Sequence, residues 1–290
     1  MRSIKKILVA IPPTAESPAL ERGLQLARRL GASLDVLLCD PQQDPDKYLD
    51  LHLVSLLRAG VHARGEVAPV DIDHASQAVL AACRDHECGL VIKQHRPSGL
   101  LSQLLMTPDD WQLLRQVPTP LFLIRGGRSW EGGTILAGMD VEHHDEEHIA
   151  LQGNVMEHAS FLCELFDAAL HVVSAYSPAL LPQADPSQRI DQAVASHCHD
   201  QCRWFMEEYE LPEHRLHIGE GPAKVLIPRI AHEFEAALTV LGTVARQGMM
   251  GTLVGNTAEA VLDRLEGDLL VLKPGAVSLE AALPSGHRAA

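Results

Sequence analysis

The strongest constraint on the fold is an internal duplication of two apolar runs. The run KILVAI at residues 6–11 recurs as TILAGM at 134–139, and PLFLIR at 120–125 recurs as DLLVLK at 268–273. The first pair marks where two blocks open and the second pair where they close, and each block has roughly 130 to 150 residues, the size of one ordinary domain. We therefore predict two related domains, at residues 1–127 and 132–275, followed by a flexible tail at 276–290.

Within both blocks, short apolar runs alternate with stretches of helical periodicity. Strands are predicted at 7–11, 33–39, 61–67, 90–93 and 121–124, and again at 134–139, 170–175, 215–219, 238–241 and 269–272. Helices are predicted at 20–30, 48–57, 75–85 and 108–116, and again at 146–165, 188–209, 223–233 and 257–264. Alternation of strand and helix is typical of parallel sheets with right-handed crossovers and helices on both faces. The predicted fold class is α/β, with two tandem doubly wound five-stranded parallel sheets.

Composition narrows the classes of partner. The 290 residues are 46% hydrophobic, carry a net charge of −14 and contain no cluster of lysine and arginine. Because phosphate-rich polymers and anionic membranes require clustered cations, we expect neither as a partner. The start of the chain lacks the features of a signal peptide, and six cysteines suit reduced, packed thiols. We therefore expect a cytoplasmic protein that does not span a membrane.

The second block carries polar and glycine residues directly after two predicted strands. Met139 and Asp140 end and follow its first strand, and Gly242 and Thr243 follow its fourth. Ligands of parallel sheets bind beyond the carboxyl ends of the strands, where the strand order reverses. If these strands are neighbours, a carboxylate and a loop that lets backbone N–H groups approach phosphate face one crevice. The alternative is that the glycines only form a compact turn over a packed core.

Other residues around this crevice extend the candidate site. Gly221 lies in a turn before a predicted helix, and Arg246 is the single cation of the loop at 242–256. Gly255 closes that loop, and Asn256, followed by Thr257, is a favourable N-cap whose helix directs its positive end toward the crevice. No lysine ends the loop, so a Walker-type phosphate site is absent. Its apolar residues leave a non-nucleotide, more apolar metabolite as an alternative ligand.

This pattern resembles the ATP-binding members of the universal stress protein family, in the tandem E-type form. Those members carry an aspartate after the first strand and a G-x2-G-x9-G-(S/T) loop. Asp140 matches the aspartate, Gly242 the first glycine and Gly255 the last, whereas Ala245 replaces the second glycine and Asn256 the hydroxyl residue. The resemblance implies a five-stranded parallel sheet in each domain, with the domains paired through their last strands as an intramolecular pseudo-dimer. A homodimer is a further option.

The resemblance also implies a function in stress response. The second domain would bind an adenine nucleotide, ATP or AMP, with or without Mg²⁺. Asp140 would hold the base or ribose, Gly242, Thr243 and Gly255 the sugar and phosphates, and Asn256 with Thr257 the helix terminus. A ligand-free structural or partner-binding stress protein is the second alternative. No catalytic triad is evident, so we assign no catalytic residues and expect at most slow ATP hydrolysis.

The first block departs from the binding pattern. Pro12 stands at the position of the aspartate, Lys93 at that of the first glycine and Met106 at that of the last. Thr107 and Pro108 nevertheless form a favourable helix start. We therefore expect the Lys93 side chain to fill the crevice and this half to act as a structural partner.

Three groups of histidine and cysteine suggest metal sites but have simpler interpretations. The segment HDEEH at 144–148 lacks the glutamate that zinc peptidases place beside the first histidine, and we interpret it as a solvated helix start. The segment HCHDQC at 197–202 falls on an amphipathic stripe typical of core packing. Cys83 and Cys88 are interpreted as packed thiols rather than a redox pair. The sequence therefore predicts no metal site.

Overall fold

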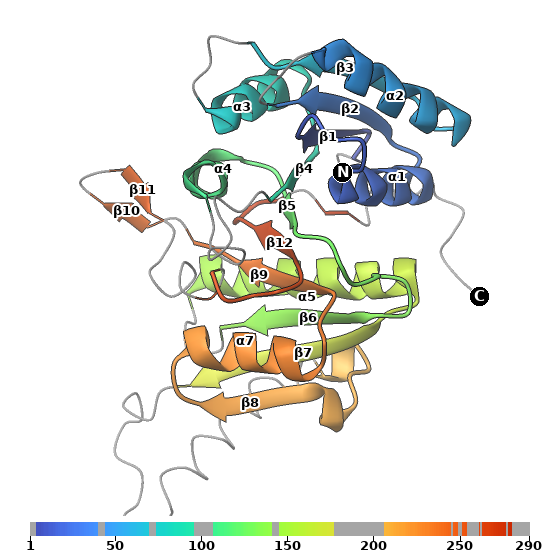
Figure 1. Ribbon diagram of the computed structural model, residues 1–290. Helices are drawn as coiled ribbons and strands as arrows, with labels where there is room; N and C mark the ends of the chain where they lie inside the picture. The colour runs from blue at the N-terminus through green and yellow to red at the C-terminus, as the bar shows by residue number, and fades with distance from the viewer. Residues whose placement is uncertain are drawn as a thin grey trace, which may run out of the picture.

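The computed structural model describes residues 4–39, 44–69, 74–95, 107–140, 145–176, 206–244, 246–248, 251–253, 261, 263–276 and 278–279. Within these ranges the chain forms one ten-stranded sheet and a separate two-stranded ribbon (Figure 1). The order of strands in the large sheet is β3-β2-β1-β4-β5-β12-β9-β6-β7-β8. None of the described helices has both the length and the hydrophobicity of a membrane span.

In its described residues, the first half supplies five parallel strands and four helices. The strands are β1 (Lys6–Ile11), β2 (Ser33–Leu38), β3 (Ala63–Val67), β4 (Leu90–Gln94) and β5 (Leu121–Ile124). The helices are α1 (Pro18–Leu30), α2 (Pro45–Arg58), α3 (Ala75–Asp85) and α4 (Pro108–Gln116). The chain runs from β1 outward to β3 and then returns to the other side of β1, so the strand order reverses between β1 and β4.

The second half repeats this arrangement. Its strands are β6 (Thr134–Met139), β7 (Ala169–Tyr176), β8 (Leu216–Glu220), β9 (Leu238–Gly242) and β12 (Asp268–Leu272). The helices whose bounds fall within its described residues are α5 (Glu146–Phe166), the short 3₁₀ helix η2 (Glu213–Arg215) and α7 (Ala223–Glu233). Every predicted strand is present, and the α/β class is confirmed. The helices predicted at 188–209 and 257–264 lie mostly outside the described residues.

Local sequence explains where the helices begin and end. The Ser17 hydroxyl accepts the backbone N–H of Leu20 at 3.2 Å and caps the start of α1. Gly31 follows the helix as its C-cap in the left-handed region, with φ 65°. The predicted helix start at Thr107 is confirmed as a capping box, in which Thr107 and Asp110 each bind the other's backbone N–H. These caps satisfy N–H groups that the first turn of a helix cannot pair internally.

The two halves share one sheet because their last strands pair. β5 lies antiparallel to β12, with Phe122 opposite Leu270. This is the pairing that the resemblance implied, and it makes the strands of the two halves run in opposite directions. Helices α1, α2 and α5 cover one face over a continuous apolar cluster, and α3, α4 and α7 cover the other. The carboxyl ends of the two halves therefore open at opposite edges of the sheet.

The segment between the halves is anchored at a buried aromatic residue. Trp130 is fully buried, with its ring 5.2 Å from that of Phe122 and 5.3 Å from that of Phe166. The segment at 126–132, whose glycine and polar residues are typical of a linker, is thus anchored in the core through Trp130, while Gly127, Ser129, Glu131 and Gly132 are exposed. In the segment predicted as a tail, Leu279 is also fully buried.

A two-stranded ribbon was not predicted from the sequence. β10 (Arg246–Gly248) and β11 (Gly251–Leu253) pair antiparallel inside the glycine-containing loop, with Gly248 opposite Gly251. Figure 1 shows this ribbon projecting from the edge of the sheet near α4. The loop after β9 therefore has secondary structure of its own.

Candidate functional site

The structure brings together the two strand ends on which the candidate site depends. β6 and β9 are parallel neighbours, and Gly138 lies level with Leu241, so Met139 and Gly242 end their strands side by side. The strand order reverses between these two strands. The condition stated for the candidate site, that these strands are neighbours, is therefore met, and Asp140 and Thr243 both follow at one edge of the sheet.

The two residues at the end of β6 have different environments. The Met139 side chain is buried in the cluster beneath α5, with 5% exposure, whereas Asp140 is exposed. The Asp140 carbonyl oxygen accepts a hydrogen bond from Nε2 of Gln152, on the first turns of α5. This contact fixes the backbone at the end of β6 while the residue itself remains at the solvent edge. Of the two, only Asp140 is exposed at this edge.

Gly242 and Thr243 are explained in large part by packing. A Cβ atom on Gly242 would lie 2.7 Å from Cγ of Leu151, so the absence of a side chain lets α5 approach β9. The Thr243 N–H already donates to the carbonyl oxygen of Leu272 at 2.8 Å, and Thr243 is 5% exposed. The compact-turn alternative therefore accounts for the features of these two residues that the structure describes.

Gly221 lies at the same edge, after β8, and β7 separates β8 from β6. It follows β8 with φ 117°, a conformation that favours glycine, and its N–H donates to the carbonyl oxygen of Tyr176 at 2.9 Å. α7 begins directly after it, and Pro222 at the N-cap supplies no side-chain hydrogen bond to the first turn. The start of α7 is therefore a region where backbone N–H groups are not capped by the N-cap side chain.

The expectation that Lys93 matches Gly242 in the first half is wrong. The registers pair Ile7 with Leu90 and Ile135 with Leu238, so counting along β4 and β9 places Gln94, not Lys93, at the position of Gly242. A shift of one residue along a strand moves a side chain to the opposite face. Lys93 therefore does not fill the crevice on the α1 side. Gln94 takes that place.

Gln94 closes this position through the cap of α1. Its Oε1 accepts a hydrogen bond from the Ser17 hydroxyl at 2.7 Å. Pro12, which takes the place of the aspartate after β1, is buried. The first half thus replaces both residues of the candidate site, the carboxylate and the glycine, with internal packing.

Lys93 instead forms a buried charge cluster beneath α4. Its Nζ lies 2.6 Å from Oδ1 of Asp110, and Nδ1 of His95 lies 2.8 Å from Oδ2 of the same carboxylate. Lys93 is 7% exposed and Asp110 is fully buried. Burial alone would raise the pKa of Asp110, but the hydrogen bonds of His95 and Thr107 and the charge of Lys93 together hold that pKa well below its ordinary value.

The comparison with protein families decides the assignment. A model described as the universal stress protein family matches residues 3–125 and again residues 133–273. The chain belongs to the universal stress protein family. The two matches make it a tandem member, as the sequence resemblance predicted.

Relatives of this tandem universal stress protein match along nearly the whole chain. Universal stress protein E of Escherichia coli strain K12 is 28% identical over 94% of this chain and 95% of its own length. A universal stress protein E homolog of Haemophilus influenzae is 31% identical over 69% of this chain and 66% of its own. A functionally unknown protein from Pseudomonas aeruginosa PAO1, with a solved crystal structure, is 38% identical with a TM-score of 0.81, covering 96% of this chain and 94% of that one.

The fold likeness extends to more distant universal stress proteins. One from Archaeoglobus fulgidus DSM 4304 has a TM-score of 0.56 at 17% identity, covering 92% of this chain and 98% of that one. At this identity the likeness concerns the fold alone. It shows that the two-domain arrangement persists where most side chains differ.

In this universal stress protein, part of the family's loop falls outside the described residues. Gly255, Asn256 and Thr257 lie there, as does Ala245. The backbone of Arg246 begins β10. The structure therefore brings together Met139, Asp140, Gly242 and Thr243, and places Gly221 at the same edge two strands beyond β6.

The structure describes, in whole or in part, two of the three histidine and cysteine groups that were considered as metal sites in the sequence. Asp145 caps α5, accepting the N–H of His148 at 3.1 Å, which confirms a helix start within HDEEH. The segment 197–202 lies outside the described residues. Cys83 and Cys88 are buried free thiols, and burial raises the pKa of each. Cys88 also lies near Asp35 and His86, a grouping that the sequence did not predict because Asp35 is far from the other two in the chain.

Proposed function

We propose that this tandem universal stress protein binds an adenine nucleotide at the edge where β6 and β9 end, and that it acts in stress adaptation in the cytoplasm. The observation that carries this proposal is the pairing of β6 with β9 at the reversal of strand order. That pairing places the exposed Asp140 beside the start of the loop after β9. Crevices of this kind are where parallel sheets bind nucleotides.

This edge offers a ligand two kinds of group, a carboxylate that accepts hydrogen bonds and backbone N–H groups that donate them. The exposed carboxylate of Asp140 is suited to accept hydrogen bonds from a ribose hydroxyl or an exocyclic amine. Gly221 and the uncapped start of α7 lie at the same edge, where backbone N–H groups and the helix dipole favour an anion. Gly255, Asn256 and Thr257 would complete the phosphate contacts by the family resemblance. Binding, rather than catalysis, is the role that these groups support.

A second candidate ligand is a non-nucleotide metabolite with more apolar surface than ATP. The N–H of Thr243 is donated to Leu272 and its hydroxyl oxygen lies 3.5 Å from the same carbonyl oxygen, so Thr243 offers less to a phosphate than the family pattern implies. The loop that follows contains Met249, Met250, Leu253 and Val254. An apolar metabolite would use this loop for packing and Asp140 for a single polar contact.

Calorimetric titration of ATP and AMP into wild-type protein tests the first candidate. We expect one binding site per chain, lost or weakened at least about tenfold in Asp140→Ala, because one charge-assisted hydrogen bond contributes about 1.5–3 kcal/mol. Glu16→Ala is a matched control, since Glu16 is exposed in the half that has lost the motif. Phosphate release measured on the same samples reports any slow hydrolysis.

Mass spectrometry of gently purified protein separates the two candidates. A co-purified adenine nucleotide supports the first, and an apolar compound together with no heat from ATP supports the second. Equal nucleotide affinity in wild type and Asp140→Ala would contradict the assignment of this edge. Absence of any bound molecule and of any nucleotide binding would favour a ligand-free stress protein.

A further inference from the structure

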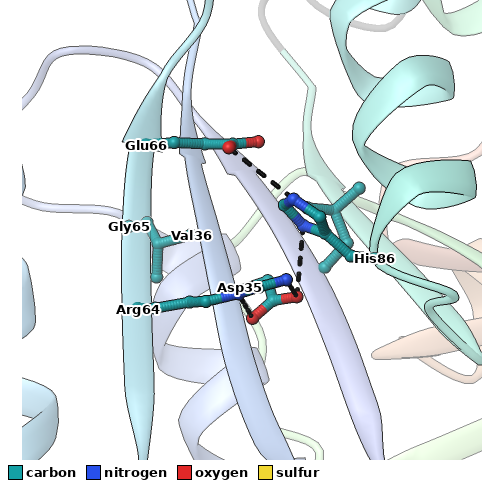
Figure 2. Close-up of a pocket in the computed structure, with 7 residues that line it drawn as sticks. Asp35, Val36, Arg64, Gly65, Glu66 and His86 are labelled. Carbon is teal, nitrogen blue, oxygen red and sulfur yellow. Dashed lines mark hydrogen bonds and ion pairs between the residues drawn. The ribbon is translucent and has the colours of Figure 1, made fainter.

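A cluster of potential metal ligands lies in the first half, beside strands β2 and β3 and the end of α3. A cavity of about 60 Å³ opens between β2, β3 and the end of α3. It is lined by Leu8, Asp35, Val36, Arg64, Gly65, Glu66 and His86. Figure 2 shows Asp35, Arg64 and Glu66 directed from the two strands toward the ring of His86. The cavity is therefore walled on one side by carboxylates and on the other by an imidazole.

Three potential metal ligands meet beside this cavity. Nδ1 of His86 lies 3.2 Å from Oδ2 of Asp35, and Sγ of Cys88 lies 3.9 Å from the same oxygen. All three atoms lie within 4.8 Å of one another. In a tetrahedral zinc site with bonds of about 2.0–2.3 Å, neighbouring ligand atoms are about 3.3–3.7 Å apart. The spacing therefore approaches that of a zinc site before any adjustment.

The ring nitrogen that faces Asp35 is not otherwise used. Nδ1 of His86 is buried, and among the described residues it has no hydrogen-bond partner, since its contact with Asp35 lacks hydrogen-bond geometry. A buried polar atom without a partner is costly. A cation placed between Nδ1, the carboxylate and the thiol would satisfy all three groups.

The backbone holds the two ligands of the α3–β4 turn in place. His86 caps α3, and Glu87 takes the left-handed region with φ 51°, so that the chain reverses between His86 and Cys88. The N–H of Cys88 donates to the carbonyl oxygen of Cys83 at 3.1 Å, and Nζ of Lys6 donates to that of His86 at 3.0 Å. The positions of both side chains are thus fixed by the fold.

We propose that Asp35, His86 and Cys88 form a zinc-binding site, with the fourth position taken by a water molecule in the cavity. One thiolate, one imidazole and one carboxylate are ligands that zinc accepts in tetrahedral sites. Binding displaces the thiol proton of Cys88 to solvent, which is the ordinary course for a cysteine ligand. Three protein ligands and one water leave a position that an incoming ligand could occupy.

Two further residues support this site without binding the ion. Oε2 of Glu66 lies 3.6 Å from Nε2 of His86, the nitrogen that faces away from Asp35. A carboxylate at the second ring nitrogen is the usual way in which a metal-binding histidine is oriented. Arg64 binds both oxygens of Asp35, at 2.6 and 2.7 Å, and its side chain is 57% exposed. It can keep Oδ1 while Oδ2 turns to the ion.

Metal titration of chelator-treated, full-length protein tests the proposal. Wild type should bind one Zn²⁺ at this site, and Co²⁺ in its place should give a thiolate-to-metal charge-transfer absorption. Cys88→Ser should abolish that absorption, and Cys88→Ser and His86→Gln should each weaken Zn²⁺ binding at least tenfold, on the order of the losses seen for groups around metal sites. X-ray absorption of zinc-loaded wild type should show one sulfur at about 2.3 Å.

Other cysteines provide matched controls. Cys163 is a buried free thiol in the second half, and Cys163→Ser should bind Zn²⁺ as wild type does. The double variant Cys198→Ser/Cys202→Ser tests the other histidine–cysteine segment and should leave the charge-transfer absorption unchanged. Loss of the absorption in that double variant, with retention in Cys88→Ser, would overturn the proposal. So would the absence of sulfur around zinc in wild type.

Arg64→Gln keeps the proposal testable if a ligand variant fails to fold. Removing an exposed positive charge beside a cation should strengthen Zn²⁺ binding severalfold. If the cluster were only an ion-pair network, zinc would not bind there and Arg64→Gln would leave Zn²⁺ affinity unchanged.

Discussion

Nε1 of Trp130 donates a hydrogen bond to Oδ2 of Asp268 at 2.9 Å, which ties the segment between the halves to the first residue of the last strand. The same carboxylate accepts from Nε of Arg22 at 3.1 Å and from the backbone N–H groups of Arg125 and Gly126 at 2.9 Å each. Asp268 is 1% exposed. One buried acceptor of the second half is therefore satisfied entirely by donors of the first half and the linker.

We expect Asp268→Asn to lower the free energy of unfolding by about 3–5 kcal/mol, as the loss of one partner of a buried ion pair does. The amide cannot serve as a charged acceptor for Arg22, and its NH₂ group would face donors. Urea unfolding, followed by fluorescence of the three tryptophans, measures the change. Because the carboxylate joins the halves, the variant should also make their unfolding less cooperative.

Glu266→Gln is the matched control for this change. Glu266 is 42% exposed and pairs with Arg128 and His232 at the surface, so its loss should cost less than about 1 kcal/mol. Equal effects of the two substitutions would contradict a central role for Asp268.

A second prediction concerns Gly242 and Leu151. Gly242→Ala should destabilise the fold by about 1–3 kcal/mol, because the added Cβ would lie 2.7 Å from Cγ of Leu151. Leu151→Ala is itself destabilising but removes the clash, so the double variant should cost less than the sum of the two single variants. Urea unfolding of all four proteins measures the coupling. Strict additivity would show that Gly242 is not required by α5.

Much of the fold could be predicted because each element carries its own signal. The runs at 7–11 and 134–139 are apolar and short, and helices such as α3 and α4 have boundaries that match their predicted ranges. Asp140 and Gly242 were found because each directly follows such a run. These are local features, so they can be read without knowing what packs against them.

What the sequence did not reveal depends on contacts between distant residues. Lys93 was assigned to the wrong face because the two halves were aligned one residue out of register, which only the sheet pairing corrects. Asp35 precedes Cys88 by more than fifty residues, so no spacing motif links them. The role of Leu151 in requiring Gly242 depends on how closely α5 approaches β9, which no local pattern encodes.

A third prediction concerns the buried pair of Lys93 and Asp110. Lys93→Met should destabilise the protein by about 3–5 kcal/mol, since it leaves a fully buried carboxylate without its ammonium partner. Adding Asp110→Asn should restore part of this loss, because the uncompensated charge is then gone. Thermal and urea unfolding measure both. Lys47→Met, at an exposed position of α2, should change stability by no more than about 0.5 kcal/mol.

A last prediction concerns pH, through two histidines on β7 and β8. Nδ1 of His171 lies 2.9 Å from Nε2 of His217, and both rings pack on Phe234 at 4.6 and 4.5 Å. Burial, followed by the charge of His217, lowers the pKa of His171 to about 4, and burial also lowers the pKa of His217. One ring must donate to the other, so the folded protein does not accommodate both rings protonated.

The lowered pKa of His171 makes the folded protein less stable as the pH falls. The unfolded chain binds a proton at His171 near pH 6.5 and the folded chain only near pH 4, so stability is full above about pH 6.5 and falls as the pH drops toward 4. His171→Phe removes this site and should flatten the decline by on the order of 2 kcal/mol. Urea unfolding at pH 4.5 and 7.5 measures the difference, and His62→Gln, at an exposed position, should decline as wild type does. An undiminished pH dependence in His171→Phe would show that other groups govern the acid sensitivity of the fold.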